Sequence, residues 1–247
     1  MCGFSRRFDA SYRDVFEKIE NGMIGRPSII RSQTCDKHDP GAFFVEYSKF
    51  SGGCFVDMSG EGLLSFKYYL ANTATKVHDI DLALWYFGAD AAVKSVAASG
   101  IVAVAPGLKQ YGDYDNAVGI VEFFGGRVAY FFCSRMMAHG QEDTTEIIGT
   151  EGKLSVNINP QSNFVNTYTS TGINREIPPH YYGRFEQAFV QEANEWTQAC
   201  LDGTKLPMKL SGALRAVQIG SYLQEALRTG RKIYFDETGK TVEHASL

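Results

Sequence analysis

Residues 117–136 read AVGIVEFFGGRVAYFFCSRM, two apolar runs separated by Gly125 and Gly126. Both runs are rich in β-branched and aromatic residues, which favour strands. Glycine readily adopts positive φ, the backbone conformation that two-residue hairpin turns require. The stretch therefore predicts two consecutive antiparallel strands, over residues 117–124 and 127–136, joined by a tight turn.

The pattern around this hairpin extends the sheet and adds helices. Further strands are predicted over residues 28–35, 92–104 and 146–154 (a strand–turn–strand), with an edge strand over 232–235 and an extended entry at 54–58. Apolar residues at helical spacing predict helices over residues 9–22, 79–87, 185–201 and 214–229, while 41–50 is ambiguous. Strands occur in consecutive runs and do not alternate with helices. This order favours an α+β fold, an open, predominantly antiparallel or mixed sheet with helices on one face, over a doubly wound nucleotide-binding fold.

Composition narrows the functional classes. The chain has 247 residues, 44% of them hydrophobic and 21% charged, which excludes intrinsic disorder and a coiled coil. A net charge of −4 and the lack of a polybasic run disfavour nucleic-acid and membrane partners. The five cysteines include no C-x-x-C pair, and the first residues resemble no secretory signal. We expect a reduced, cytoplasmic protein without a metal site.

The common motifs of dinucleotide-binding enzymes, hydrolases, metalloproteases and NTPases find little support in the sequence. Residues 59–65, SGEGLLS, invite comparison with a dinucleotide-binding loop, but a serine replaces the third glycine and no βαβ unit follows. We therefore interpret this segment as a loop and expect no cofactor-binding residue in the chain. No G-x-S-x-G, H-E-x-x-H or P-loop sequence occurs.

Three groups of polar residues are candidates for chemistry. His78 opens an apolar helix in the run His78-Asp79-Ile80-Asp81, where it can serve as a general acid or base; alternatively, the two aspartates only cap the helix. Asp57 is a second candidate, since an acid at the end of a buried strand has few structural duties there. Arg6 and Arg7 could clamp an anionic or polyol ligand, or could pair with Asp9.

Five segments together resemble the Gfo/Idh/MocA oxidoreductases, the glucose–fructose oxidoreductase and inositol dehydrogenase family. They are GFSRRFDASY (3–12), GMIGRP (22–27), SGGCFVDM (51–58), VHDIDLALWYFG (77–88) and IGTEGKL (148–154). Their order and spacing match the family over most of residues 3–235. The resemblance implies a C-terminal domain like that of glyceraldehyde-3-phosphate dehydrogenase, which often forms dimers through its open sheet face.

The same resemblance implies a function and a site. The activity would be that of an NAD(P)-dependent dehydrogenase acting on a polyol, such as an inositol, or on a sugar. His78 would take the hydroxyl proton, and Asp57 would orient the substrate and the histidine. Arg6, Asp81 and Tyr182 would contact the substrate.

The chain departs from the family at its start. Family members begin with a Rossmann domain that binds NAD(P) and supplies a lysine from an E-K-P motif, and neither is present in these residues. We therefore expect residues 1–247 to form a single substrate and dimerisation domain, a truncated form that is inactive by itself. The alternative is a non-catalytic binding or oligomerisation module derived from the same family.

A second departure concerns the predicted acid/base pair. The family places its aspartate and histidine in D-x-x-x-H, whereas Asp57 and His78 are 21 positions apart. Removing residues 60–76, GEGLLSFKYYLANTATK, restores the family spacing. We interpret these residues as an insertion and hypothesise an unspliced short intron read in frame. Loop closure over this length costs little free energy, so the insertion need not unfold the domain, but it would blur the catalytic geometry.

Overall fold

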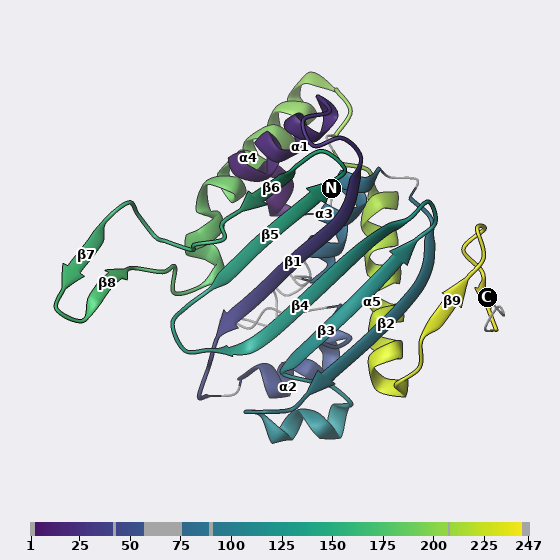
Figure 1. The fold of residues 1–247 in the computed structure, drawn as a ribbon, viewed down its shortest axis with the longest axis horizontal. Coiled ribbons are helices and arrows are strands. Elements are labelled where there is room, and N and C mark those ends of the chain that lie inside the picture. The colour runs from purple at the N-terminus through teal and green to yellow at the C-terminus, as the bar shows by residue number, and fades with distance from the viewer. Residues whose placement is uncertain (1–2, 42, 57–75, 89–90, 207, 244–247) are drawn as a thin grey trace.

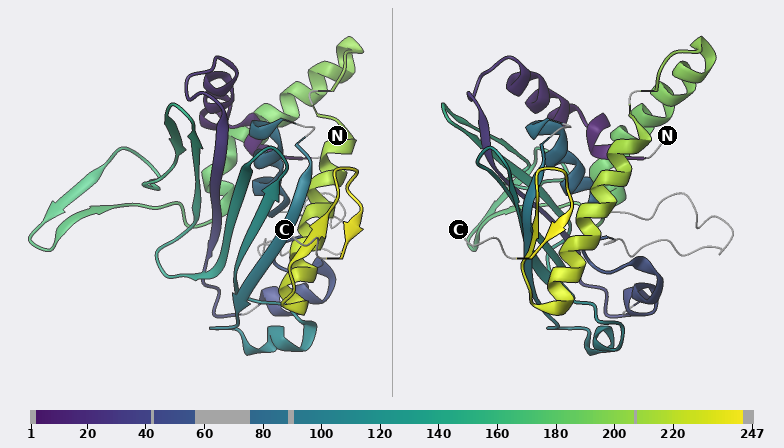
Figure 2. Two further views of the ribbon diagram at one scale, coloured as in Figure 1. Left: turned by 45° about the vertical axis from the view of Figure 1, so that its right-hand side comes forward. Right: turned by 90° about the vertical axis from the view of Figure 1, so that its right-hand side faces the viewer.

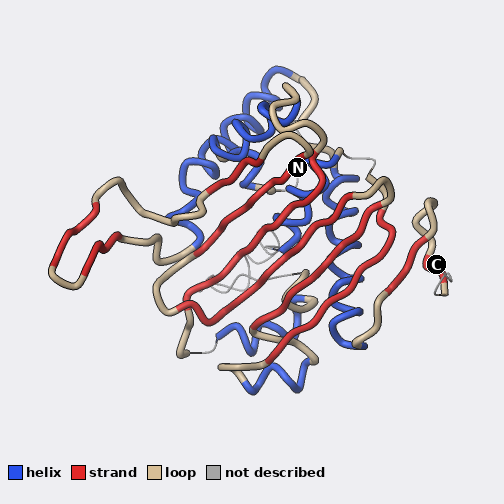
Figure 3. Tube along the Cα trace, viewed as in Figure 1, coloured by secondary structure: helices blue, strands red, loops and turns tan. Residues whose placement is uncertain are grey.

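The structure is a computed structural model that describes residues 3–41, 43–56, 76–88, 91–206 and 208–243. At its centre the described residues form an eight-stranded sheet in the order β10-β9-β2-β3-β4-β1-β5-β6 (Figure 1). The strands are β1 (Pro27–Lys37), β2 (Val93–Ile101), β3 (Asn116–Phe123), β4 (Arg127–Met137), β5 (Glu142–Gly149), β6 (Lys153–Val156), β9 (Ile233–Phe235) and β10 (Thr241–Val242). A separate ribbon of β7 (Asn166–Thr169) and β8 (Gly172–Arg175) extends away from this sheet (Figure 3).

The register confirms the predicted hairpin and shows why the sheet is mixed. Strands β3 and β4 pair antiparallel, with Phe123 opposite Arg127, and the two turn glycines have φ of 79° and 75°. Strand β1 enters between β4 and β5, parallel to the first and antiparallel to the second. The α+β fold with a mixed sheet is therefore confirmed.

The helices cover one face of the sheet. They are α1 (Ala10–Glu20), α2 (Phe43–Ser51), α3 (Lys76–Phe87), α4 (Tyr181–Asp202) and α5 (Leu210–Thr229), with short 3₁₀ turns η1 (Ser5–Phe8) and η2 (Pro106–Tyr111). Helix α3 packs against β1 and β4, and α5 against β2 and β3. Figure 2 shows both helices on the same side, while no described helix covers the opposite face.

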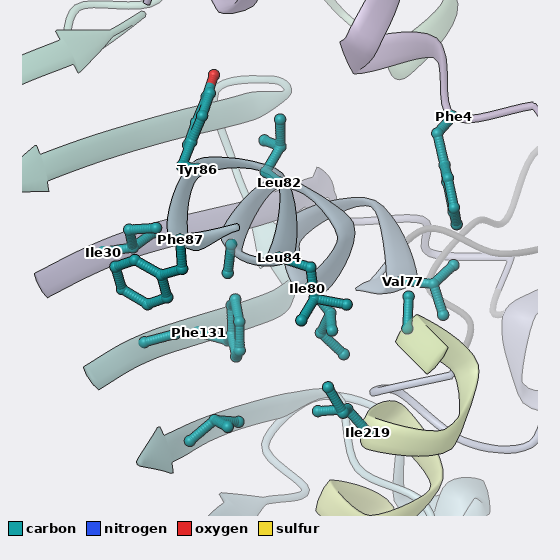
Figure 4. Packing of buried hydrophobic residues seen from close by; sticks show 14 of the residues in the cluster. Phe4, Ile30, Val77, Ile80, Leu82, Leu84, Tyr86, Phe87, Phe131 and Ile219 are labelled. Carbon is teal, nitrogen blue, oxygen red and sulfur yellow. The ribbon is translucent and has the colours of Figure 1, made fainter. Parts of the chain in front are cut away.

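The core lies between α3, α5 and the sheet. Ile80 of α3 lies near Ile219 of α5, and Phe131 of β4 lies beneath α3 (Figure 4). Helix α3 is buried on nearly all sides because the sheet, α1 and α5 enclose it. Its first turn, which carries His78, is consequently held by packing on several sides.

Several local predictions need correction. The ambiguous residues 41–50 largely form α2, and residues 54–56 form a turn, in which the Val56 amide donates to the Gly53 carbonyl at 3.0 Å, and not an extended entry. Strand β9 is not an edge, because β10 pairs along its outer side. The predicted insertion at 60–76 lies outside the described residues except for Lys76, with which α3 begins.

None of the helices formed by the described residues has the length and hydropathy of a transmembrane segment.

Candidate active site

The imidazole of His78 lies where η1, α3 and α4 meet. The side chain is 6% exposed, and the ring of Phe4 packs edge-on against it at 5.3 Å between centroids. Its Nε2 atom lies 3.5 Å from the hydroxyl oxygen of Tyr181, whose hydroxyl is also 2.6 Å from Oγ of Ser5. No described residue bonds to Nδ1. The hydrogen-bond contact described for the ring is thus made through Nε2.

His78 is neutral under ordinary conditions. Burial, together with the positive charge of Arg6, lowers the pKa of His78 to about 3, and Asp79 offsets only part of this shift. A neutral imidazole has a free lone pair, so it can accept a proton from a hydroxyl group. The environment therefore suits a general base.

A buried network of charges lies beside the histidine. The guanidinium of Arg6 pairs with Asp79 and with Asp143, the latter at 2.7 Å, and donates to Oγ1 of Thr34 at 2.5 Å. Burial opposes the charge on Arg6, but its acidic and phenolic neighbours, Asp79 first, outweigh that cost and raise the pKa of Arg6. Burial raises the pKa of Asp143, and Arg6 offsets part of that rise.

The network ties the first turn of α3 to the sheet. The Asp79 carboxylate accepts hydrogen bonds from the hydroxyls of Ser32 at 2.6 Å and Thr34 at 2.8 Å, both on β1. Through Arg6 the same carboxylate is linked to Asp143 on β5. A buried charge needs such partners, since an unpaired one would cost several kcal/mol. These contacts fix Asp79. Because Asp79 directly follows His78 in the chain, they also hold the histidine in place.

The structure gives two of the expected substrate contacts other partners. Arg6 is 1% exposed and is enclosed by its ion pairs. Asp81 accepts two hydrogen bonds from Arg7, at 2.6 and 2.7 Å. The alternative pairing of these arginines with Asp9 is wrong, because Asp9 caps α1 and pairs with Arg184 at 2.8 Å.

Tyr182 and Asp57 are the remaining predicted site residues. Tyr182 is 49% exposed, and the hydroxyl that reaches His78 belongs to its neighbour Tyr181. Asp57 lies outside the described residues, so its distance to His78 stays a prediction. Within the part of the chain that is described, the structure therefore brings His78 and Arg6 into one site and leaves Tyr182 at its margin.

Sequence reasoning missed Tyr181, Asp143 and the two β1 hydroxyls. Ser32 and Thr34 alternate with outward-facing residues along β1, so the period of two could have placed them on the buried face. Asp143 stands in the run Glu142-Asp143-Thr144-Thr145, which has no motif signal. Among the described residues, no group of three or more metal-ligating side chains is present.

Comparison of the sequence with known proteins identifies relatives of this chain. Residues 73–155 match the GFO/IDH/MocA C-terminal domain model. The chain is 29% identical to the scyllo-inositol 2-dehydrogenase (NAD(+)) of Bacillus subtilis over 95% of its own length and 62% of that protein. It is 24% identical to the myo-inositol 2-dehydrogenase of Thermotoga maritima, over 95% of this chain and 64% of that protein.

Solved structures share the fold. The scyllo-inositol dehydrogenase of Lactobacillus casei with bound NAD(H) and scyllo-inositol is 28% identical and has a TM-score of 0.81, covering 95% of this chain and 64% of that one. The myo-inositol 2-dehydrogenase of Lactobacillus plantarum has a TM-score of 0.83 at 24% identity, over 95% and 64% of the two chains. The curated relatives and the solved structures agree with this domain match, and residues 73–155 thus correspond to the C-terminal domain of the Gfo/Idh/MocA family.

Proposed function

We propose that this chain provides the substrate-binding part of an NAD(P)-dependent dehydrogenase that oxidises an inositol-like polyol or a sugar. The observation that carries the proposal is a neutral, buried His78 beside a polar network, in a chain related to inositol dehydrogenases. The chain spans 62–64% of the length of the curated relatives quoted above, so their whole-protein activity is proposed here. The resemblance to this family also supports the proposal that the chain has a fold like the C-terminal domain of glyceraldehyde-3-phosphate dehydrogenase.

Oxidation of a secondary alcohol removes a proton from oxygen and a hydride from carbon. Neutral His78 would accept the hydroxyl proton, and Asp57 would orient the ring and the substrate. Ion pairs already occupy Arg6 and Asp81, so we assign these two to holding α3 in place. Among the predicted contacts, exposed Tyr182 is then the side chain with a hydroxyl free to meet a polyol.

The described residues do not fit a dinucleotide. Such cofactors are held by a glycine-rich turn between a strand and a helix of a βαβ unit. In the described sheet β1 and β4 form the parallel pair, and neither leads through a G-x-G-x-x-G turn into a helix. NAD(P)⁺ would accept the hydride, and none of the described side chains is assigned to holding it.

The test is polyol binding followed at His78. Scyllo-inositol and myo-inositol are titrated into the purified chain while the His78 ring signals are monitored by NMR. We expect saturable shifts with either inositol and none with cyclohexanol, which has the ring but a single hydroxyl. Equal responses to all three compounds, or none to the inositols, would remove the proposal. The chain itself is expected not to bind NAD(P)H, and micromolar affinity would contradict that part.

A second proposed role is self-association through the open sheet face. Ile29, Ile101 and Ile120 alternate with core residues along their strands, so they point from the face that no described helix covers, and each is at least 41% exposed. Light scattering should show an oligomer for the wild type and a smaller species for Ile120→Asp. Met23→Asp, at an exposed turn, is the matched control and should leave the mass unchanged. A monomeric wild type would contradict this role.

A further inference from the structure

Tyr181 reaches the candidate active site from the first position of α4. Its ring packs against those of Phe185 and Phe189, at 5.0 and 5.6 Å between centroids. This packing directs the hydroxyl inward, to a point between Ser5 on η1 and His78 on α3. Three elements that are distant in sequence therefore meet at one phenolic oxygen.

The phenol is suited to join its two neighbours. A tyrosine hydroxyl donates one hydrogen bond and accepts others, so it can accept from one partner while it donates to the other. Ser5 is fully buried, and its short contact of 2.6 Å restricts where the Tyr181 oxygen can lie. Burial also raises the pKa of Tyr181, so the phenol keeps its proton. The phenol can donate to Oγ of Ser5 while its oxygen accepts from Nε2–H of His78, which leaves the lone pair of Nδ1 for the base.

The adjacent tyrosine provides a natural contrast. Successive residues of a helix point about 100° apart, so Tyr181 and Tyr182 cannot face the same group. The ring of Tyr182 lies 6.2 Å from that of His180, and its side chain is half exposed. The hydrogen bonds described at His78 and Ser5 involve Tyr181.

We propose that Tyr181, anchored by Ser5, is a positioning residue that fixes the orientation and tautomer of the His78 imidazole through Nε2. The hydrogen bond made by one ring nitrogen determines which nitrogen carries the proton. A base must be held within about half an ångström of its working position, and this contact restrains the ring from the side of α4. We call the contact of Tyr181, anchored by Ser5, with Nε2 of His78 the tether. The tether is a property of this chain, and only its consequence for turnover rests on the proposed dehydrogenase function.

The tether is tested by the ¹⁵N shifts of the His78 ring in the wild type and in Tyr181→Phe, which removes the hydroxyl and keeps the packed ring. We expect one dominant tautomer in the wild type and shifts close to the average of the two tautomers in the variant. Ser5→Ala removes the anchor and should move the shifts in the same direction. Tyr182→Phe is the matched control and should reproduce the wild-type spectrum.

Each outcome decides the proposal. Unchanged shifts in Tyr181→Phe, or an equal change in Tyr182→Phe, would overturn the tether. If an enzyme that contains this chain oxidises inositol, Tyr181→Phe should lower kcat about fivefold, the equivalent of one hydrogen bond, with little change in KM. An altered spectrum without any inositol oxidation by the wild type would keep the tether and reject the dehydrogenase function. Failure of the tether and failure of the proposed dehydrogenase function therefore give different results.

Discussion

Arg7 and Asp81 form an ion pair with two hydrogen bonds, of 2.6 and 2.7 Å, that joins η1 to α3. Asp81 is almost fully buried, and the Arg7 guanidinium also lies 5.1 Å from the centroid of the Trp85 ring. A double-mutant cycle of Arg7→Met and Asp81→Leu should give a coupling energy of about 1–3 kcal/mol in urea unfolding. Additive effects would show that the pair contributes nothing beyond its separate side chains.

Arg6 should be far more important for stability than an exposed arginine. Arg6→Met leaves Asp79 and Asp143 buried without their shared cation, which should cost about 3–5 kcal/mol of unfolding free energy. Arg31→Met is the control, because Arg31 is 58% exposed in its pair with Glu146 and should cost less than about 1 kcal/mol. Similar losses in the two variants would contradict the buried network.

His78 should make stability depend on pH. Its pKa is lowered from 6.5 to about 3 in the folded protein, so the unfolded chain binds the proton first as the pH falls. Above pH 6.5 His78 is neutral in both states, so its contribution to the free energy of unfolding does not change with pH. Below pH 6.5 the free energy of unfolding falls by about 1.4 kcal/mol per pH unit, down to about pH 3. Unfolding of wild type and His78→Gln between pH 7 and 5 measures this difference. A difference independent of pH would show that the histidine is not shielded.

The β7–β8 ribbon should be cut early by proteases. All eight strand residues are exposed, and the ribbon pairs only with itself in the described structure. An isolated two-stranded ribbon is marginally stable in water. Chymotrypsin should therefore cleave after Tyr168, which is 73% exposed, before it cleaves after buried Tyr12. Mass spectrometry of the first fragments checks this order, and an intact ribbon after α4 has been cut would contradict it.

Local signals predicted most of the elements because their causes are local. The paired glycines at 125 and 126 permit the positive φ that a tight turn requires, and both adopt it in the β3–β4 turn. Asp9 caps α1 through the amides of Ser11 and Tyr12, as its position before an apolar helical pattern suggests. Thr167, Tyr168 and Ile173 carry strand propensity around a Ser-Thr-Gly turn, so the ribbon had a signal that was missed.

The candidate site was less predictable because its contacts are long-range. Arg6 pairs with Asp79, 73 positions away, and with Asp143, 137 positions away, whereas the sequence offered nearby Asp9. Choosing between Tyr181 and Tyr182 requires the rotation of α4 about its axis, which depends on how Phe185 of α4 stacks on Tyr12 and how α4 packs against η1. The family resemblance identified the region of the site, and tertiary packing decided which side chain reaches His78.

The place of β1 in the sheet has a consequence for how the chain folds. This strand, made early in synthesis, lies between β4 and β5, whose residues begin 90 or more positions later. Pairings of such high contact order form slowly, and the early strand waits with both edges open until its neighbours leave the ribosome. Fragments that end before Glu142 would lack β5, the antiparallel neighbour of β1, and should aggregate. Assembly of this sheet is therefore governed by the chain's middle third, well after its first strand is complete.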